Sequence, residues 1–194
     1  MWPVVSTFAL TFDDGPDPTW TAKLLDLLRE RDARATFFPI ASRAAAHPEL
    51  IARMSREGHT VGLHCDVHVR HSDRDIAWLR RDTRHALGRL QRLGVEPVFW
   101  RTPWGDTAPW SAQVAQEHGL RLVGWTVDTH DWRGDLAIDM FEASREELRP
   151  GTIVLAHDGI GPGARRKSIE ETLRYVALVA DFARRRGLAL EALA

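Results

Sequence analysis

Side chains with acid–base and metal-binding chemistry gather in five short clusters, each directly after an apolar run of strand type. The clusters are Asp13-Asp14-Gly15-Pro16, His64 to His68, Arg101-Thr102-Pro103-Trp104, Asp128 to Trp132 and His157-Asp158. In parallel α/β folds the carboxyl ends of the strands meet on one face, so clusters scattered along the chain are expected to lie together. Carboxylates, histidines and an arginine in one place are the components of a metal-assisted hydrolase. The sequence therefore predicts an enzyme.

Asp13 and Asp14 are adjacent carboxylates at the end of the first apolar run. Successive side chains leaving a strand point in different directions, so one carboxylate can bind a cation while its neighbour faces a bound water. The alternative is a turn whose carboxylates accept hydrogen bonds from backbone amides and cap the following helix.

His64 and His68 are four residues apart, the spacing that brings two imidazoles to one metal from a helical turn. With Asp14 they make a set of two histidines and one carboxylate. Such a set leaves coordination positions open for water and substrate, as catalytic zinc, cobalt or another divalent ion requires. The same spacing also arises by chance, and His71 could share the helical face and compete for the ligand role.

The later clusters contribute groups that suit an oxyanion and a leaving group. The proline-fixed turn after Arg101 can aim its guanidinium and leave the backbone N–H of Trp104 free to bind an oxyanion, whereas the alternative is a salt bridge beside a turn. His157 ends another strand, and an aspartate partner there would raise its pKa and suit it to general acid work. A strand-end histidine can equally be structural.

The elements that must position these clusters alternate between strand and helix. Strand-type runs occur at 8–12, 35–40, 60–63, 98–100, 120–127, 153–156 and 188–193, with helical patterns between them. Connections too long for hairpins favour a parallel sheet with helices outside it. We expect a single α/β domain over residues 1–194 built as a distorted parallel (β/α) barrel, closed or nearly closed, with about seven strands. The alternative is an open doubly wound sheet.

Composition excludes several other classes of protein. The chain has 194 residues, 44% of them hydrophobic, and a formal net charge of -1, which fits one domain and predicts neither a nucleic-acid nor a membrane partner. The basic runs at 165–167 and 184–186 are interpreted as solvated helix faces. A basic leader with a cleavage site is absent, so we expect either a cytoplasmic protein or a trimmed secreted domain. Cys65 is the single cysteine, which excludes an internal disulfide.

The five clusters, in this order and at these intervals, resemble the five motifs of the NodB-type polysaccharide deacetylases, carbohydrate esterase family 4. The similarity runs from Phe8 to about Leu193. The matching residues are Thr11-Phe12-Asp13-Asp14-Gly15-Pro16, His64-x-x-x-His68, Arg101-x-Pro103-Trp104, Asp128-x-x-Asp131-Trp132 and Leu155-x-His157. The resemblance implies a distorted (β/α) barrel, a divalent metal that is usually Zn²⁺, and hydrolysis of the acetamido group of N-acetylglucosamine units in chitin-like or peptidoglycan poly- or oligosaccharides.

The resemblance also implies a role for each matching residue. The metal ligands would be Asp14, His64 and His68. The general base would be Asp13 and the general acid His157. Arg101 would orient Asp13, and Asp128 would tune His157. The amide of Trp104 would help bind the oxyanion, and Trp132 and Leu155 would wall the pocket for the acetyl methyl group.

This chain departs from the family pattern after its first motif histidine. Cys65 stands where the family usually has serine or threonine, and the stretch 66–73, with Arg70 and His71, differs from the usual asparagine- and proline-containing loop. Other activities therefore stay open: an O-acetyl esterase on xylan or small esters, a hydrolase of cyclic imides or ureides, and a carbohydrate-binding relative without turnover. Eight tryptophans are compatible with sugar stacking in the last case.

Overall fold

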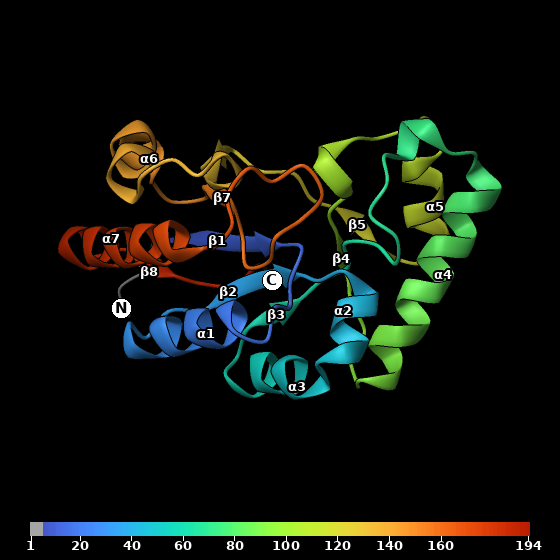
Figure 1. Cartoon of the computed structure of the whole chain (residues 1–194), viewed down its shortest axis with the longest axis horizontal. Helices are drawn as coiled ribbons and strands as arrows, with labels where there is room; N and C mark the ends of the chain where they lie inside the picture. The colour runs from blue at the N-terminus through green and yellow to red at the C-terminus, as the bar shows by residue number, and fades with distance from the viewer. Residues whose placement is uncertain (1–5) are drawn as a thin grey trace, which may run out of the picture.

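A computed structural model describes residues 6–194 of the chain, and residues 1–5 of the expected domain lie outside that range. Five parallel strands form the centre of the sheet, in the order β3-β2-β1-β7-β6 (Figure 1). They are β1 (Thr7–Asp13), β2 (Ala35–Phe38), β3 (Thr60–Val61), β6 (Val127–Asp128) and β7 (Ile153–His157). Six of the seven residues of β1 are buried, because a parallel strand covered on both faces needs a nearly continuous apolar sequence.

Three further strands extend this sheet. β4 (Phe99–Trp100) and β5 (Arg121–Leu122) pair with each other, and a bridge from Leu63 to Trp100 joins β4 to the segment after β3. β8 (Ala189–Leu190) pairs with the beginning of β1. Between residues 6 and 194 no ladder joins β5 to β6. The expected parallel α/β architecture is confirmed, and its barrel is not closed by strand pairing.

The strand expected over 120–127 is wrong in its extent, since the structure divides it into β5 and β6. The carbonyls between them face a side chain instead of a neighbouring strand: Arg101 donates from Nη2 to Gly124 O at 2.8 Å and from Nε to Val123 O at 3.4 Å. A buried guanidinium thus replaces ladder partners at this point, and the chain bends there.

Helices surround the strands: α6 packs on α7, α1 lies beside α3, α4 packs on α2 and α5, and α5 lies next to β5 (Figure 1). Helix α1 shows why they pack inward, because Leu24, Leu25 and Leu28 lie on one buried stripe. The α-helices are α1 (Trp20–Glu30), α2 (Ala41–Ala46), α3 (Pro48–Arg56), α4 (Ile76–Arg92), α5 (Ser111–Glu117), α6 (Ala137–Ser144) and α7 (Glu170–Arg186). Short 3-10 turns are η1 (His71–Asp73), η2 (Pro103–Gly105), η3 (Asp131–Arg133) and η4 (Arg145–Glu147). No helix among residues 6–194 has the length and apolar character needed to cross a membrane.

The sheet register brings reactive side chains from distant parts of the sequence together. One hydrophobic core packs the strands against the helices. Within it, the rings of Phe12 in β1 and Phe37 in β2 are stacked, with their centroids 5.4 Å apart. Asp13, the last residue of β1, then pairs in register with Phe38 on one side and with His157 on the other. The carboxyl ends of β1 and β7 therefore present a carboxylate beside an imidazole.

Candidate active site

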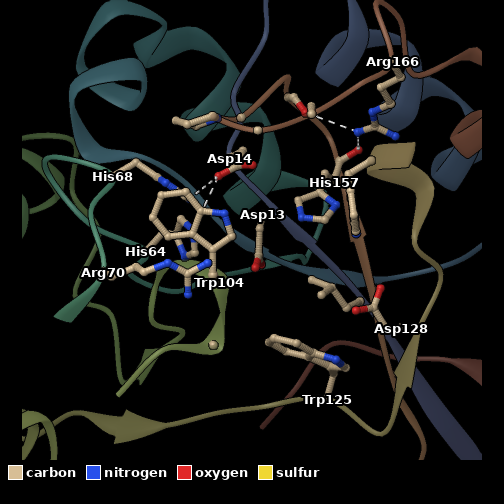
Figure 2. A pocket seen from close by; sticks show the side chains of 18 residues that line it. Asp13, Asp14, His64, His68, Arg70, Trp104, Trp125, Asp128, His157 and Arg166 are labelled. Atoms are coloured by element: carbon tan, nitrogen blue, oxygen red, sulfur yellow. Dashed lines mark hydrogen bonds and ion pairs between the residues drawn. The ribbon is translucent and has the colours of Figure 1, made fainter. Parts of the chain in front are cut away.

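A cavity of about 410 Å³ opens at the carboxyl ends of the central strands (Figure 2). Nine of the ten residues selected from the sequence line it: Asp13, Asp14, His64, His68, Trp104, Asp128, Trp132, Leu155 and His157. The tenth, Arg101, is fully buried and contacts Asp13. The structure therefore brings all ten residues to one place, as the convergence of strand ends predicts.

Asp14, His64 and His68 form one compact group of possible metal ligands. Asp14 Oδ1 lies 3.4 Å from His64 Nε2 and 3.1 Å from His68 Nε2, and one ligand atom from each residue lies within 4.8 Å of the others (Figure 2). These two contacts lack hydrogen-bond geometry, so Asp14 Oδ1 is a buried acceptor without a donor. Burial raises the pKa of Asp14, but the two histidines outweigh this effect and hold it well below its usual range. Two imidazole nitrogens and an ionised carboxylate oxygen around an unsatisfied acceptor fit a divalent cation.

The backbone around the ligands is shaped to hold them in place. Asp14 has a φ of 74°, a left-handed conformation that is unusual outside glycine. Its carbonyl accepts a hydrogen bond of 2.8 Å from Arg43 Nη1. A Cβ atom on Gly161 would lie 1.8 Å from Asp14 Oδ2, so only glycine fits there and lets the loop after β7 close over the carboxylate.

His64 is oriented by a second contact on its other ring nitrogen. Its Nδ1–H donates to the carbonyl of Arg101 at 2.7 Å, which fixes the tautomer and leaves Nε2 free as a ligand. The helical turn expected over His64 and His68 is wrong: the two residues lie in an irregular loop. That loop is held by backbone pairing, including the bridge from Ile40 to Cys65.

His71 and Cys65 lie outside the ligand group. His71 Nδ1 is 2.9 Å from Ser111 Oγ. The centroid of the His71 ring lies 5.1 Å from that of the Trp100 ring. Burial lowers the pKa of His71 to about 4, so it is a neutral packing residue near neutral pH. Cys65 is buried, and burial raises the pKa of its thiol.

Asp13 is held by a fully buried arginine. Arg101 Nη1 donates to Asp13 Oδ1 at 3.0 Å and to Thr11 Oγ1 at 2.6 Å, and its guanidinium lies 4.4 Å from the ring centroid of Phe38. A buried ion pair with further hydrogen bonds has little orientational freedom. The contact between Arg101 and Asp13 expected from the family resemblance is thus present.

His157 is paired with Asp131, a residue of the fourth cluster to which the resemblance gives no role. Asp131 Oδ1 accepts from His157 Nδ1 at 2.7 Å, and Asp131 Oδ2 accepts from Arg166 Nη1 at 2.6 Å and from Thr172 Oγ1 at 2.8 Å. Burial lowers the pKa of His157, but the carboxylates of Asp131 and, less strongly, of Asp13 and Asp14 raise it to about 9 overall. His157 is therefore protonated near neutral pH and keeps Nε2 free for the cavity.

Asp128 is the residue expected to tune His157, but among residues 6–194 no hydrogen bond or ion pair joins the two, and Asp131 is the carboxylate on His157 Nδ1. Asp128 Oδ1 instead accepts a hydrogen bond of 2.8 Å from the backbone N–H of His130. Arg166 is a second correction, since it belongs to a basic run interpreted as solvated, yet only 5% of its side chain is exposed. The signal for Asp131 was present in the fourth cluster, but nothing in the sequence pointed to Arg166 or Thr172.

Aromatic side chains form the walls of the cavity. The Trp104 ring packs edge-on against the His68 ring, with the two centroids 4.2 Å apart. The backbone of Trp104 has a φ of 54° in the turn after β4. Trp132 and Leu155 line the cavity together with Trp125, which the sequence analysis did not select. A polar floor with apolar walls suits a small acyl group attached to a sugar.

Comparison with protein families identifies a match over most of the chain. Residues 4–123 match the family model of polysaccharide deacetylases. A chitooligosaccharide deacetylase from Bradyrhizobium sp. (strain ANU 289) is 34% identical over 191 residues, which cover 95% of this chain and 87% of that relative.

Solved structures resemble the whole fold. The Bc1960 peptidoglycan N-acetylglucosamine deacetylase superposes with a TM-score of 0.89 at 29% identity, covering 98% of this chain and 87% of that one. A family 4 carbohydrate esterase from Streptomyces lividans, in complex with acetate, superposes with a TM-score of 0.87 at 27% identity. The superposition covers 97% of this chain and 93% of the esterase. The similarity in fold therefore extends over nearly the whole chain.

Proposed function

Because the chain belongs to the polysaccharide deacetylase family, we propose that it hydrolyses the acetamido group of N-acetylglucosamine units in chitin-like or peptidoglycan saccharides and releases acetate. The observation that carries this proposal is the Asp14–His64–His68 group, which shares one cavity with Asp13 and His157. We take residues 1–194 as a single catalytic domain. The relatives support the substrate class, since their names specify chitooligosaccharide and peptidoglycan.

Asp14, His64 and His68 would hold a divalent cation, and Zn²⁺ suits two imidazole nitrogens and one carboxylate oxygen best, with Co²⁺ as an alternative. Such a cation, when bound, supplies Lewis acidity to the acetyl carbonyl and makes a nearby water more acidic. The protein fixes the geometry of this site through the hydrogen bond from His64 Nδ1 to the Arg101 carbonyl.

Asp13 is the general base of the proposed reaction. It lies next to the ligand group and faces the same cavity, so it accepts a proton from the water that attacks the acetyl carbon. Arg101 keeps the Asp13 carboxylate in one orientation through the contact at 3.0 Å. An attacking water therefore meets a base that is already aligned.

His157 is the general acid and Trp104 contributes to oxyanion binding. Nδ1 of His157 is occupied by Asp131, so Nε2 gives its proton to the departing amine nitrogen. An amine expelled without that proton is a poor leaving group. The backbone N–H of Trp104 donates to the oxyanion, while Trp132 and Leu155 contact the acetyl methyl group. Asp128 is proposed only as a polar wall residue.

Acetate release from a substrate panel tests this function. Purified protein is assayed on chitooligosaccharides and peptidoglycan fragments before chelation, after chelation and after Zn²⁺ is returned. Asp13→Asn and His157→Ala are expected to lower turnover by about 10²-fold or more each. His85→Ala, an exposed histidine on α4, is the matched control and should keep full activity.

Adding acetylated xylan and a cyclic imide to the panel separates the alternative activities. Faster release from acetylated xylan than from chitooligosaccharides would identify an O-acetyl esterase, and hydrolysis of a cyclic imide alone would identify the other hydrolase. Sugar binding without metal-dependent acetate release would indicate a relative without turnover. Near-normal acetate release from Asp13→Asn or His157→Ala would contradict the assigned roles.

A further inference from the structure

We propose that Arg70, with Arg133 and Arg165, forms a cationic rim that makes the enzyme prefer acetylated saccharides carrying a carboxylate over neutral ones. This inference rests on the proposed deacetylase function and adds a preference for one chemical class of substrate. Arg70 lies in the stretch 66–73, which departs from the family pattern, and it lines the cavity.

Arg70 is held at the cavity mouth in an orientation suited to an anion. Its guanidinium carbon lies 4.8 Å from the centroid of the Trp104 ring (Figure 2). The centroids of the Trp104 and His68 rings are in turn 4.2 Å apart. A planar guanidinium stacked on an indole loses less freedom when it binds a carboxylate than an unstacked one. One aromatic ring therefore separates this cation from a proposed metal ligand.

The guanidinium of Arg70 makes only a weak ion pair within the protein. Its Nη1 is 3.9 Å from Asp106 Oδ1, at the limit of an ion pair, and Asp106 already accepts hydrogen bonds from the backbone N–H and the hydroxyl of Ser72 at 2.8 and 3.1 Å. The Arg70 side chain is 48% exposed. By contrast, Arg101 and Arg166 are buried against Asp13 and Asp131. Arg70 is thus the cavity-lining arginine that offers donors to a ligand.

Trp132, another aromatic residue that lines the cavity, has cations beside it as well. The guanidinium carbons of Arg133 and Arg165 lie 5.2 and 5.7 Å from the ring centroid of Trp132, and both residues are exposed. Asp128, a carboxylate that lines the same cavity, already accepts a hydrogen bond from the backbone N–H of His130. Because the net charge of the chain is only -1, attraction of an anion here is local to the mouth.

Carboxylates of a saccharide are the anions that this arrangement can reach while an acetamido group enters the cavity. Two sources share that chemistry, a lactyl ether on an amino sugar and a uronic acid on its neighbour. Glycan strands of peptidoglycan provide the first and hyaluronan oligosaccharides the second. A matched neutral probe is the same peptidoglycan strand after its carboxylates are converted to methyl amides.

Steady-state acetate release from the acidic strand, its amidated form, hyaluronan oligosaccharides and chitotetraose provides the test. Wild type is expected to show a higher kcat/KM on an acidic saccharide than on the neutral ones. Arg70→Gln should lower kcat/KM on the acidic substrate about 5- to 10-fold, as for a partly exposed charge-assisted contact. The neutral substrates should change by less than about 2-fold. Arg70→Lys should keep part of the preference, and Arg56→Gln, an exposed arginine on α3, should keep all of it.

The outcomes separate this inference from the function on which it rests. An equal loss on acidic and neutral substrates would mean that Arg70 only positions Trp104, and would overturn the inference. Equal kcat/KM of wild type on the acidic and amidated strands would overturn it too. Absence of acetate release from every probe would refute the deacetylase function, and the substrate preference with it.

Discussion

Replacing Asp131 with asparagine tests whether the buried carboxylate behind His157 sets its protonation. In the wild type, Asp131 Oδ1 accepts from His157 Nδ1 at 2.7 Å, and the pKa of His157 is raised from 6.5 to about 9. Asparagine retains a similar shape and an acceptor oxygen but carries no charge. The pKa of His157 should therefore fall towards its ordinary value of 6.5, because burial still lowers it while only Asp13 and Asp14 continue to raise it.

The expected effect on rate follows from the protonated fraction of His157. A general acid with a pKa of about 9 is about 90% protonated at pH 8, and one with a pKa of 6.5 is about 3% protonated, so the loss of rate is at most about 30-fold. At pH 6 the two forms differ by less than about 2-fold. Activity of Asp131→Asn should consequently be restored at acidic pH. The alkaline limb of its pH–rate profile should move down by up to about 2.5 pH units.

The same substitution affects stability, and the sign follows from linkage. The folded state raises the pKa of His157, so its contribution is present below pH 6.5 and is lost as the pH rises through about 9. Asparagine removes this contribution and leaves Arg166 without its buried partner, at a cost of about 3 kcal/mol or more. Circular dichroism at each assay pH shows which losses of rate come from unfolding.

The assay is acetate release across pH 5 to 10 for wild type, Asp131→Asn and Asp128→Asn. Asp128→Asn is the matched control, because this carboxylate lines the same cavity but binds the backbone of His130. The alkaline limb of its pH–rate profile should coincide with that of the wild type. A bound cation would shift all three proteins alike, so the difference between variants is the quantity to compare. An unchanged limb in folded Asp131→Asn, or a shifted limb in Asp128→Asn, would refute the reasoning.

Two further substitutions test the support of the site. Gly161→Ala places a Cβ where it would lie 1.8 Å from Asp14 Oδ2, so zinc affinity measured by competition with a chelating dye should fall about 10- to 100-fold. Gly88→Ala, whose Cβ meets only Arg92 Nη1 at 3.7 Å, should leave that affinity unchanged, and equal affinities in all three proteins would contradict the close approach. Burial raises the pKa of Asp158 from 3.8 to about 7, so the free energy of unfolding falls as the pH rises from about 4 to about 7. Asp158→Asn should remove this loss, which is on the order of 4 kcal/mol. The melting temperature of Asp158→Asn relative to wild type should therefore rise between pH 5 and pH 8, and a constant difference would show that Asp158 does not titrate in this range.

The sequence predicts well those parts of the site that depend on strand ends. Asp13, Asp14 and His157 follow long apolar runs, and parallel pairing of those runs brings their ends together regardless of the loops. His64 and His68 also meet at Asp14, but through an irregular loop rather than a helix. Spacing alone does not separate these two conformations, because both bring the imidazoles to one point.

The parts that the sequence does not predict depend on contacts between loops. Arg166 reaches Asp131 only because the loop after β7 folds back over η3, a contact between residues that lie 35 apart in the chain. Its neighbours Arg165 and Lys167 are exposed, so the basic run has no periodicity that would indicate one buried member. The division of the strand expected over 120–127 has a similar origin, because Arg101 takes the carbonyls of Val123 and Gly124.

Metal content provides the most direct measurement on the central claim that Asp14, His64 and His68 hold one cation. Elemental analysis of the purified protein, loaded with Zn²⁺ and dialysed, should give about one equivalent per chain. His68→Ala should bind at least about 10-fold more weakly, whereas His85→Ala should bind like the wild type. Absence of bound metal in the wild type, or full retention by folded His68→Ala, would contradict the account.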